Sequence, residues 1–156
     1  MTNTNNHQQK LKQLGLAVIS TEADAILNLK QHIDDHFIHA CELILQCKGK
    51  VIVIGMGKSG HIANKIAATL ASTGTPAFFV HPGEASHGDL GMISENDVAL
   101  ALSNSGETGE IISILPIIKR LGVPLLSITG NPASTLATLS DASINASIEK
   151  EACPLG

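Results

Sequence analysis

The pattern that most clearly suggests chemistry is the loop of residues 103–108, Ser-Asn-Ser-Gly-Glu-Thr, which lies between an apolar run and a helical pattern. The hydroxyls of Ser103, Ser105 and Thr108, the flexible Gly106 and the first amides of the next helix could surround one phosphate without an arginine. Ordinary helix capping is the alternative, and it would need only one Ser or Thr. The three hydroxyls therefore favour phosphate binding.

A second loop, residues 55–60, has the sequence Gly-Met-Gly-Lys-Ser-Gly and matches the dinucleotide fingerprint G-x-G-x-x-G between a strand pattern and a helix pattern. Its glycines could let a phosphate approach amides at a helix N-terminus, and a structural tight turn is the alternative. A nicotinamide cofactor is disfavoured, because the next strand ends in His81 and not in an acidic residue for the ribose. A P-loop is excluded, since Ile52 occupies the position of its first glycine.

Two more loops follow expected strands. Residues 81–90 place His81 and His87 beside two carboxylates, which could orient sugar hydroxyls, serve acid–base chemistry or hold a metal ion. An ordinary polar loop is the alternative, because the spacing is not that of a compact metal site. Residues 129–132, Thr-Gly-Asn-Pro, could line the same crevice as the serine-rich loop.

Two glutamates stand where catalytic carboxylates could act. Glu110 lies one turn into the helix after the serine-rich loop, and Glu151 lies just past the last expected strand. Near the carboxyl edge of a sheet they could meet over a bound sugar, and a carboxylate beside a carbinol carbon can move a proton between adjacent carbons. That proton shuttle is the chemistry of aldose–ketose isomerisation. Surface glutamates favoured by the helix dipole are the alternative.

These loops require a sheet to position them, and the apolar pattern predicts one. Apolar residues have helical spacing within 11–46, as one bent helix or two, and a continuous β-branched run begins at Val51. Strands without polar alternation, separated by helices, indicate a doubly wound, flavodoxin-like α/β fold with a five-stranded parallel sheet. Pro116 is expected to kink or break its helix. The expected strands are 51–54, 77–80, 98–102, 124–129 and 142–148, and the helices between them are 59–72, 108–121 and 133–140.

Composition limits the classes of function. The length of 156 residues suits one domain. A net charge of −4 with one arginine, Arg120, and no basic stripe argues against nucleic acid. The apolar runs are far shorter than the roughly 18 residues of a membrane span, and the polar first ten residues do not form a signal peptide. We therefore expect a soluble cytoplasmic protein.

Cys41, Cys47 and Cys153 form no metal or disulfide motif and are expected to be inert thiols.

Five segments together carry a family resemblance. They are Gly-Met-Gly-Lys-Ser-Gly-His at 55–61, Ser-Thr-Gly-Thr-Pro at 72–76, His-Pro-Gly-Glu-Ala-Ser-His-Gly-Asp-Leu-Gly at 81–91, Ser-Asn-Ser-Gly-Glu at 103–107 and Lys-Glu-Ala-Cys-Pro-Leu-Gly at 150–156. With them, residues 41–156 resemble the sugar isomerase (SIS) domain of bacterial D-arabinose 5-phosphate isomerases. The resemblance implies interconversion of D-ribulose 5-phosphate and D-arabinose 5-phosphate, for the octulosonate sugar of lipopolysaccharide in a Gram-negative source.

The resemblance also implies roles for individual residues. Lys58 would assist ring opening or polarise the carbonyl oxygen, while Glu110 or Glu151 transfers a proton through a cis-enediol. No cofactor is required, because hydrogen moves as a proton, although a divalent metal such as zinc could bind at His81 and compete with substrate. The implied substrate-binding residues are Ser59, Gly74, Thr75, His81, His87, Ser103, Ser105, Gly106 and Thr108.

The expected organisation is a single SIS domain over 1–156, with a helical segment at 1–46 and the sheet core at 47–156. The family continues into a further helix, a Ser-His-Pro-Gly-Gly motif with a catalytic histidine, and tandem cystathionine-β-synthase domains, all of which we expect this chain to lack. The resemblance implies a homotetramer with sites between subunits. The alternative function is a non-catalytic module that binds sugar phosphates, as in the sensing domain of a regulator.

Overall fold

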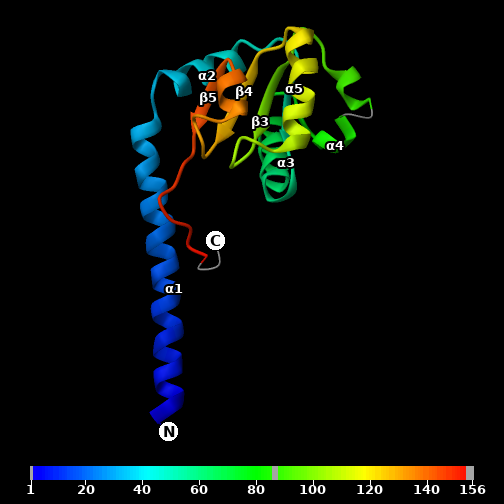
Figure 1. Ribbon diagram of the computed structural model, residues 1–156. Coiled ribbons are helices and arrows are strands. Elements are labelled where there is room, and N and C mark those ends of the chain that lie inside the picture. The colour runs from blue at the N-terminus through cyan, green and yellow to red at the C-terminus, as the bar shows by residue number, and fades with distance from the viewer. Residues whose placement is uncertain (1, 86–87, 154–156) are drawn as a thin grey trace. The chain divides into compact units, whose positions relative to one another are not determined.

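The chain forms two compact units in a computed structural model that describes residues 2–85 and 88–153 (Figure 1). One unit comprises the first 31 residues together with the segment from Ile148 onward, and the other comprises residues 32–147. The expected division into a helical segment and a sheet core within a single domain stays a prediction.

The second unit is built on a five-stranded, all-parallel sheet with the strand order β2-β1-β3-β4-β5. This confirms the predicted α/β class and the predicted number and direction of strands. The strands are β1 (Val51–Gly55), β2 (Ala77–Val80), β3 (Val98–Leu102), β4 (Leu125–Thr129) and β5 (Ala142–Asn145).

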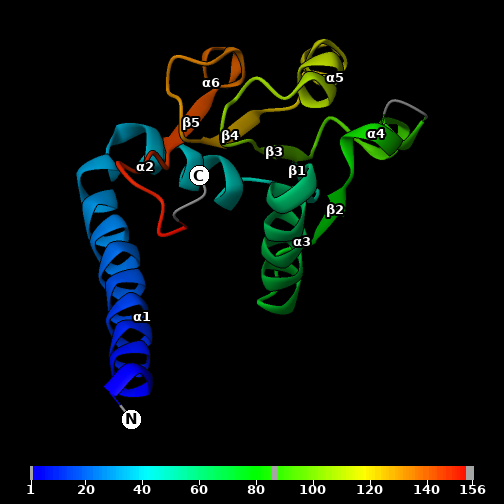
Figure 2. The same ribbon diagram turned by 60° about the horizontal axis from the view of Figure 1, so that its bottom comes forward.

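Helices cover both faces of this sheet, as the edge-on view shows (Figure 2). One face packs against α2 (Asp35–Leu45) and α3 (Gly57–Ser72), and the other packs against α4 (Pro82–Ala85), α5 (Gly109–Leu121) and α6 (Thr135–Leu139). Each face of the sheet has its own hydrophobic core, and alternate residues of β1 point into one or the other. Val51 and Val53 face α2 and α3, whereas Ile52 and Ile54 face α5. Burial on both faces explains why β1 and β3 are uninterrupted apolar runs.

The strand order places a topological switch point between β1 and β3. The chain leaves β1 towards β2 on one side and later returns to β3 on the other side. The loops after β1 and β3 therefore diverge at the carboxyl edge and leave a crevice, the usual ligand position in such sheets.

Several predicted boundaries differ from the structure. The last strand ends at Asn145 and not at Ile148, and a helix already begins at Thr2 within the polar start. Pro116 does not break α5, which runs from Gly109 to Leu121. Pro116 is exposed, so its ring points away from the core and water can reach the carbonyl that the proline leaves without a donor.

The first unit contains the long helix α1 (Thr2–Asn28), followed by the short 3-10 helix η1 (Leu29–His32), where the second unit begins. Residues of α1 and of the segment 148–153 line a cavity of about 340 Å³. Within the described ranges, no helix combines the length and apolar character needed to cross a membrane.

A buried carboxylate joins β1 and β3 at the amino edge of the sheet. Asp97 is 1% exposed and accepts hydrogen bonds from the Lys50 ammonium at 2.7 Å and from the backbone N–H groups of Lys50 at 2.9 Å and Ser94 at 2.7 Å. These three donors satisfy a charge that burial would otherwise make costly. Asp97 therefore holds the two central strands together at their starts.

Candidate functional site

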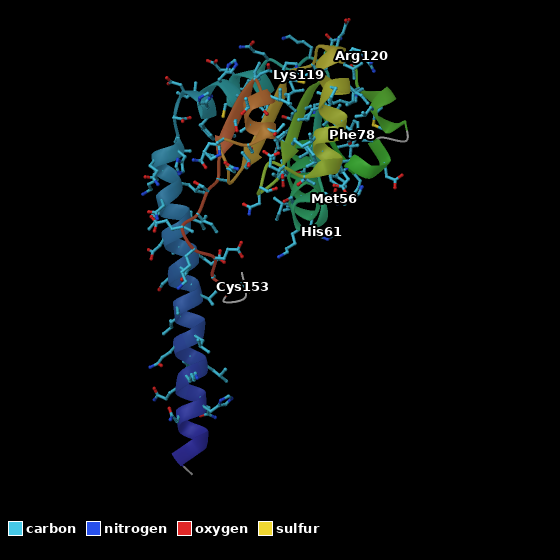
Figure 3. All side chains as sticks on the ribbon, viewed as in Figure 1. Met56, His61, Phe78, Lys119, Arg120 and Cys153 are labelled. Atoms are coloured by element: carbon cyan, nitrogen blue, oxygen red, sulfur yellow. The ribbon has the colours of Figure 1, made fainter. Side chains whose placement is uncertain are left out.

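The switch point holds a cavity of about 220 Å³. Figure 3 shows Met56 and His61 at this carboxyl edge, whereas Lys119 and Arg120, in the last turn of α5, lie at the opposite edge. The cavity brings together residues from the ends of β1, β3 and β4. Its lining consists of Lys58, Ser59, Ile62, Leu102, Ser103, Asn104, Ile128, Thr129, Gly130 and Ala146.

The first turn of α3 forms one wall of this cavity. Gly55 and Gly60 pack strand against helix so closely that a Cβ on Gly60 would lie 2.9 Å from the Gly55 carbonyl oxygen. The fingerprint glycines therefore have a structural role at these two positions. The N-cap residue Met56 makes no side-chain capping bond, so the positive end of the helix dipole remains available to an anion.

Lys58 lies in this first turn and is exposed. A cation at a helix N-terminus opposes the helix dipole, so helix stability does not explain a lysine here. Its position in the cavity wall instead suits it to meet a bound phosphate or a carbonyl oxygen.

The serine-rich loop forms the opposite wall. Ser103 is 3% exposed, its hydroxyl accepts a 3.0 Å hydrogen bond from the Gly106 N–H and it shares a 2.8 Å hydrogen bond with the Thr108 hydroxyl. The Ser105 hydroxyl accepts the Glu107 N–H at 3.2 Å and remains exposed. Thr108, the N-cap residue of α5, makes no side-chain capping bond. Two helices of 16 and 13 residues, α3 and α5, thus begin without side-chain caps. Of the serine-rich loop, Ser103 and Asn104 line the cavity, whereas the predicted residues Ser105, Gly106 and Thr108 do not.

The loop after β4 completes the wall. The Asn104 carbonyl accepts hydrogen bonds from the Thr129 hydroxyl at 3.2 Å and from the Gly130 N–H at 3.0 Å. This confirms the prediction that the loop of residues 129–132 shares the crevice, through Thr129 and Gly130. Asn104 itself lines the cavity and was not among the predicted site residues, although its place directly after a buried strand, inside the serine-rich loop, is a usable signal.

His81 lies in a separate cavity of about 240 Å³, which also involves Gly57, His61 and Asn64. Its Nδ1 accepts the Gly83 N–H at 3.2 Å, which leaves Nε2 as the nitrogen for a metal or a sugar hydroxyl. Among the described residues, no three His, Cys, Asp or Glu side chains gather closely enough to hold a metal ion. The residues around His81 therefore offer two imidazoles and do not fit a closed metal site.

The remaining predicted residues are dispersed. Gly74 and Thr75 lie between the end of α3 and the start of β2, at the amino edge and away from Lys58. Glu110 is exposed in the first turn of α5 and does not line the switch-point cavity. Glu151 belongs to the first unit, where it lines the cavity beside α1. His87 lies outside the described residues.

The fold and this cavity define a class, a doubly wound parallel α/β domain with its candidate site at the switch point. The family model described as "SIS domain" matches residues 44–155, and the chain belongs to the SIS domain family. This confirms the resemblance found in the sequence.

Similar proteins come from several bacteria. The chain is 62% identical over 137 residues to the arabinose 5-phosphate isomerase KdsD of Pseudomonas aeruginosa, covering 88% of this chain and 42% of that protein. It is 55% identical over 145 residues to KdsD of Escherichia coli K12, covering 93% of this chain and 44% of that protein. The chain therefore spans less than half the length of these relatives. An Escherichia coli CFT073 protein solved in complex with arabinose 5-phosphate is 44% identical, with a TM-score of 0.85, covering 95% of this chain and 79% of that one.

Proposed function

We propose that this chain is the SIS domain of an aldose–ketose isomerase that interconverts D-ribulose 5-phosphate and D-arabinose 5-phosphate, in the supply of octulosonate for lipopolysaccharide. The observation that carries the proposal is that Lys58 shares one cavity with Ser59 and with Ser103 and Asn104, the first residues of the serine-rich loop. Relatives 62% and 55% identical to the chain bear the name arabinose 5-phosphate isomerase. Because the chain spans only part of those relatives, activity of the whole protein remains part of the proposal.

The substrate phosphate would sit between the two uncapped helix N-termini. Backbone amides of α3 and α5 would donate to its oxygens, with the hydroxyls of Ser59, Ser105 and Thr108 around them. Ser103 would act through Thr108 and Gly106, to which it is already hydrogen-bonded. This cradle neutralises a dianion with amides, hydroxyls and the single ammonium of Lys58.

The chemical step would be a proton transfer between adjacent carbons. A carboxylate removes the C2 proton of the open-chain aldose, the electron pair forms a cis-enediol, and the carbonyl oxygen at C1 takes up a proton. Return of a proton to C1, with loss of the hydroxyl proton at C2, gives the ketose. Lys58 would stabilise the negative charge that develops on oxygen during both steps. No electrons leave the sugar, so no nicotinamide is needed.

The same site supports a second function, because binding requires only the phosphate cradle. Glu110 does not line the cavity that contains Lys58, and Glu151 lines a different one within the first unit. A non-catalytic sugar-phosphate module would need neither carboxylate. Substitutions that separate binding from turnover distinguish the two functions.

Replacing Ser105 by alanine should weaken binding of D-arabinose 5-phosphate under either function. The exposed hydroxyl is lost from the cradle, together with its hydrogen bond to the Glu107 N–H, and loss of a hydrogen bond to a charged group weakens binding by about tenfold. Titration calorimetry measures this, with Ser113→Ala as a control, since Ser113 is a serine further along α5 whose hydroxyl bonds to the Glu110 carbonyl. Equal affinity of Ser105→Ala and the unsubstituted chain would remove Ser105 from the cradle.

Replacing Glu151 by glutamine should stop turnover and leave binding of D-arabinose 5-phosphate within about threefold, since the loss of a general base costs roughly 10²-fold or more in rate. The substitution keeps size and removes the basic oxygen. Glu110→Gln is the matched variant for the other candidate base. Turnover that survives both substitutions would remove both carboxylates from the catalytic set, whereas an unsubstituted chain that binds the sugar phosphate without turnover would be the binding module.

We further propose which partners the protein has and where it acts. No cofactor takes part, and the protein acts in the cytoplasm. A divalent metal such as zinc would find two imidazoles, His61 and His81, among the described residues, so it would bind at His81 as a competitor of substrate and not in a closed site. Gly74 and Thr75 lie at the edge opposite Lys58, so a sugar contact from them requires a second copy of the chain. This supports a homo-oligomer, which we propose is a tetramer.

A further inference from the structure

The serine-rich loop is attached to the start of α6. The Gly106 carbonyl accepts a 3.1 Å hydrogen bond from the Leu136 N–H, and the Glu107 carboxylate accepts a 2.6 Å hydrogen bond from the Thr135 N–H. Thr135 is the first residue of α6, after the N-cap Ser134. The loop and the helix are therefore held by two adjacent bonds, one of them from the Glu107 side chain.

Gly106 leaves no space between the loop and α6. Its φ is +68°, and a Cβ at this position would overlap the side chain of Ser134, which is 1% exposed. Ser134 in turn accepts the Ala137 N–H at 3.3 Å and so is fixed within α6. The loop that carries Ser103 and Ser105 is therefore in direct contact with α6.

A carboxylate in a loop that binds a dianion requires an explanation. Glu107 follows Ser105 and Gly106 directly, so its charge, if free, would repel the phosphate. The structure instead pairs this charge with an amide at the positive end of another helix, which partly compensates it. The site thus tolerates the charge and gains a strong bond that fixes the loop.

We propose that Glu107 is a positioning residue, whose hydrogen bond to the Thr135 N–H holds the serine-rich loop in its phosphate-binding conformation. This inference rests on the proposed function, because it assumes that the loop binds the phosphate of D-arabinose 5-phosphate. Glu107 does not act on the reacting carbons.

Two substitutions break this bond from opposite sides. Glu107→Ala removes the acceptor. Thr135→Pro removes the donor and keeps the carboxylate, and proline is tolerated there because Thr135 is the first helical residue and Ser134 before it is extended (φ −71°, ψ 161°). Each variant should bind D-arabinose 5-phosphate about tenfold more weakly, since a bond to a charged group is lost. The double variant should be no weaker than the weaker single one.

The conservative variant Glu107→Gln tests whether the hydrogen bond from the Thr135 N–H or the negative charge of Glu107 is what matters for binding. Its amide oxygen can still accept the Thr135 N–H, so it should bind within about threefold of the unsubstituted chain. Glu95→Ala is the control for loss of a surface carboxylate, because Glu95 is exposed at the amino edge. Melting temperatures are measured in parallel by circular dichroism.

Calorimetry with D-arabinose 5-phosphate decides the outcome. Weak binding by Glu107→Ala and Thr135→Pro, with recovery in Glu107→Gln, supports the inference. Unchanged affinity in Glu107→Ala, at whatever melting temperature, overturns it and leaves the proposed function intact. Additive losses in the double variant overturn it too, because they show that the two residues act independently. No binding by the unsubstituted chain overturns the proposed function and this inference together.

Discussion

Replacing Lys58 by alanine is expected to lower turnover of D-arabinose 5-phosphate by about 10³-fold, since a group that stabilises developing oxygen charge contributes roughly that much. Among the described residues, Lys58 is the one lysine that lines the switch-point cavity. A lysine at the start of α3 does not stabilise that helix, so stability does not explain its position. Binding should weaken by no more than about tenfold, because amides and hydroxyls still hold the phosphate.

Lys65→Ala is the matched control. It removes an exposed lysine from the same helix, about two turns away from Lys58, and should leave both rate and affinity unchanged. An isomerase rate in Lys58→Ala within a few-fold of the original would remove Lys58 from the chemical step. A loss of binding equal to the loss of rate would instead make it a phosphate ligand only.

Replacing Asp97 by alanine is expected to destabilise the fold by about 2–4 kcal/mol, because two backbone N–H groups lose their acceptor at about 1–3 kcal/mol each. The Lys50 ammonium, on a side chain that is 30% exposed, can be hydrated instead. The Lys50 ammonium and two backbone N–H groups would lose their acceptor at the starts of β1 and β3. Urea unfolding followed by far-ultraviolet circular dichroism measures this, since the chain has no Trp or Tyr. Glu95→Ala, an exposed carboxylate two residues away, should leave the midpoint unchanged.

Asp97 also makes stability depend on pH. Burial alone would raise the pKa of Asp97, but the hydrogen bonds from Lys50 and Ser94 outweigh it, and the pKa lies below its ordinary value. A depressed pKa in the folded state means that the stabilisation is complete above the unfolded-state pKa of about 4 and is lost as pH falls through the folded value. Asp97→Asn should remove this part of the acid dependence. An unaltered acid transition in Asp97→Asn would contradict the assignment.

The sheet was predictable because its strands are buried on both faces. Uninterrupted apolar runs such as 51–54 and 98–102 indicate parallel strands, and the structure has β1 and β3 at these positions. The boundaries were less predictable. Residues 146–148 continue the composition of β5, yet the strand ends at Asn145, whose side-chain oxygen accepts the Ser147 N–H and turns the chain. A local hydrogen bond of this kind leaves no periodicity in the sequence.

The candidate site was predictable where topology alone brings residues together. Lys58, Ser59 and Ser103 follow β1 and β3, so any doubly wound sheet places them at one edge. Glu110 and Gly74 show the limit of that reasoning. A residue one turn into a helix can face away from the crevice, and a loop before a strand lies at the opposite edge. Glu107 could not be assigned from the sequence, because its partner Thr135 is 28 residues away.

Solvent exchange at C2 of D-arabinose 5-phosphate tests the central claim most directly. The 156-residue chain is incubated with the sugar phosphate in deuterated water, and the C2 proton is followed by NMR. An isomerase that works through a cis-enediol exchanges this proton as it forms the ketose, so we predict that the C2 signal disappears while D-ribulose 5-phosphate accumulates. A chain that binds the sugar phosphate but leaves the C2 proton in place would contradict catalysis and identify a binding module.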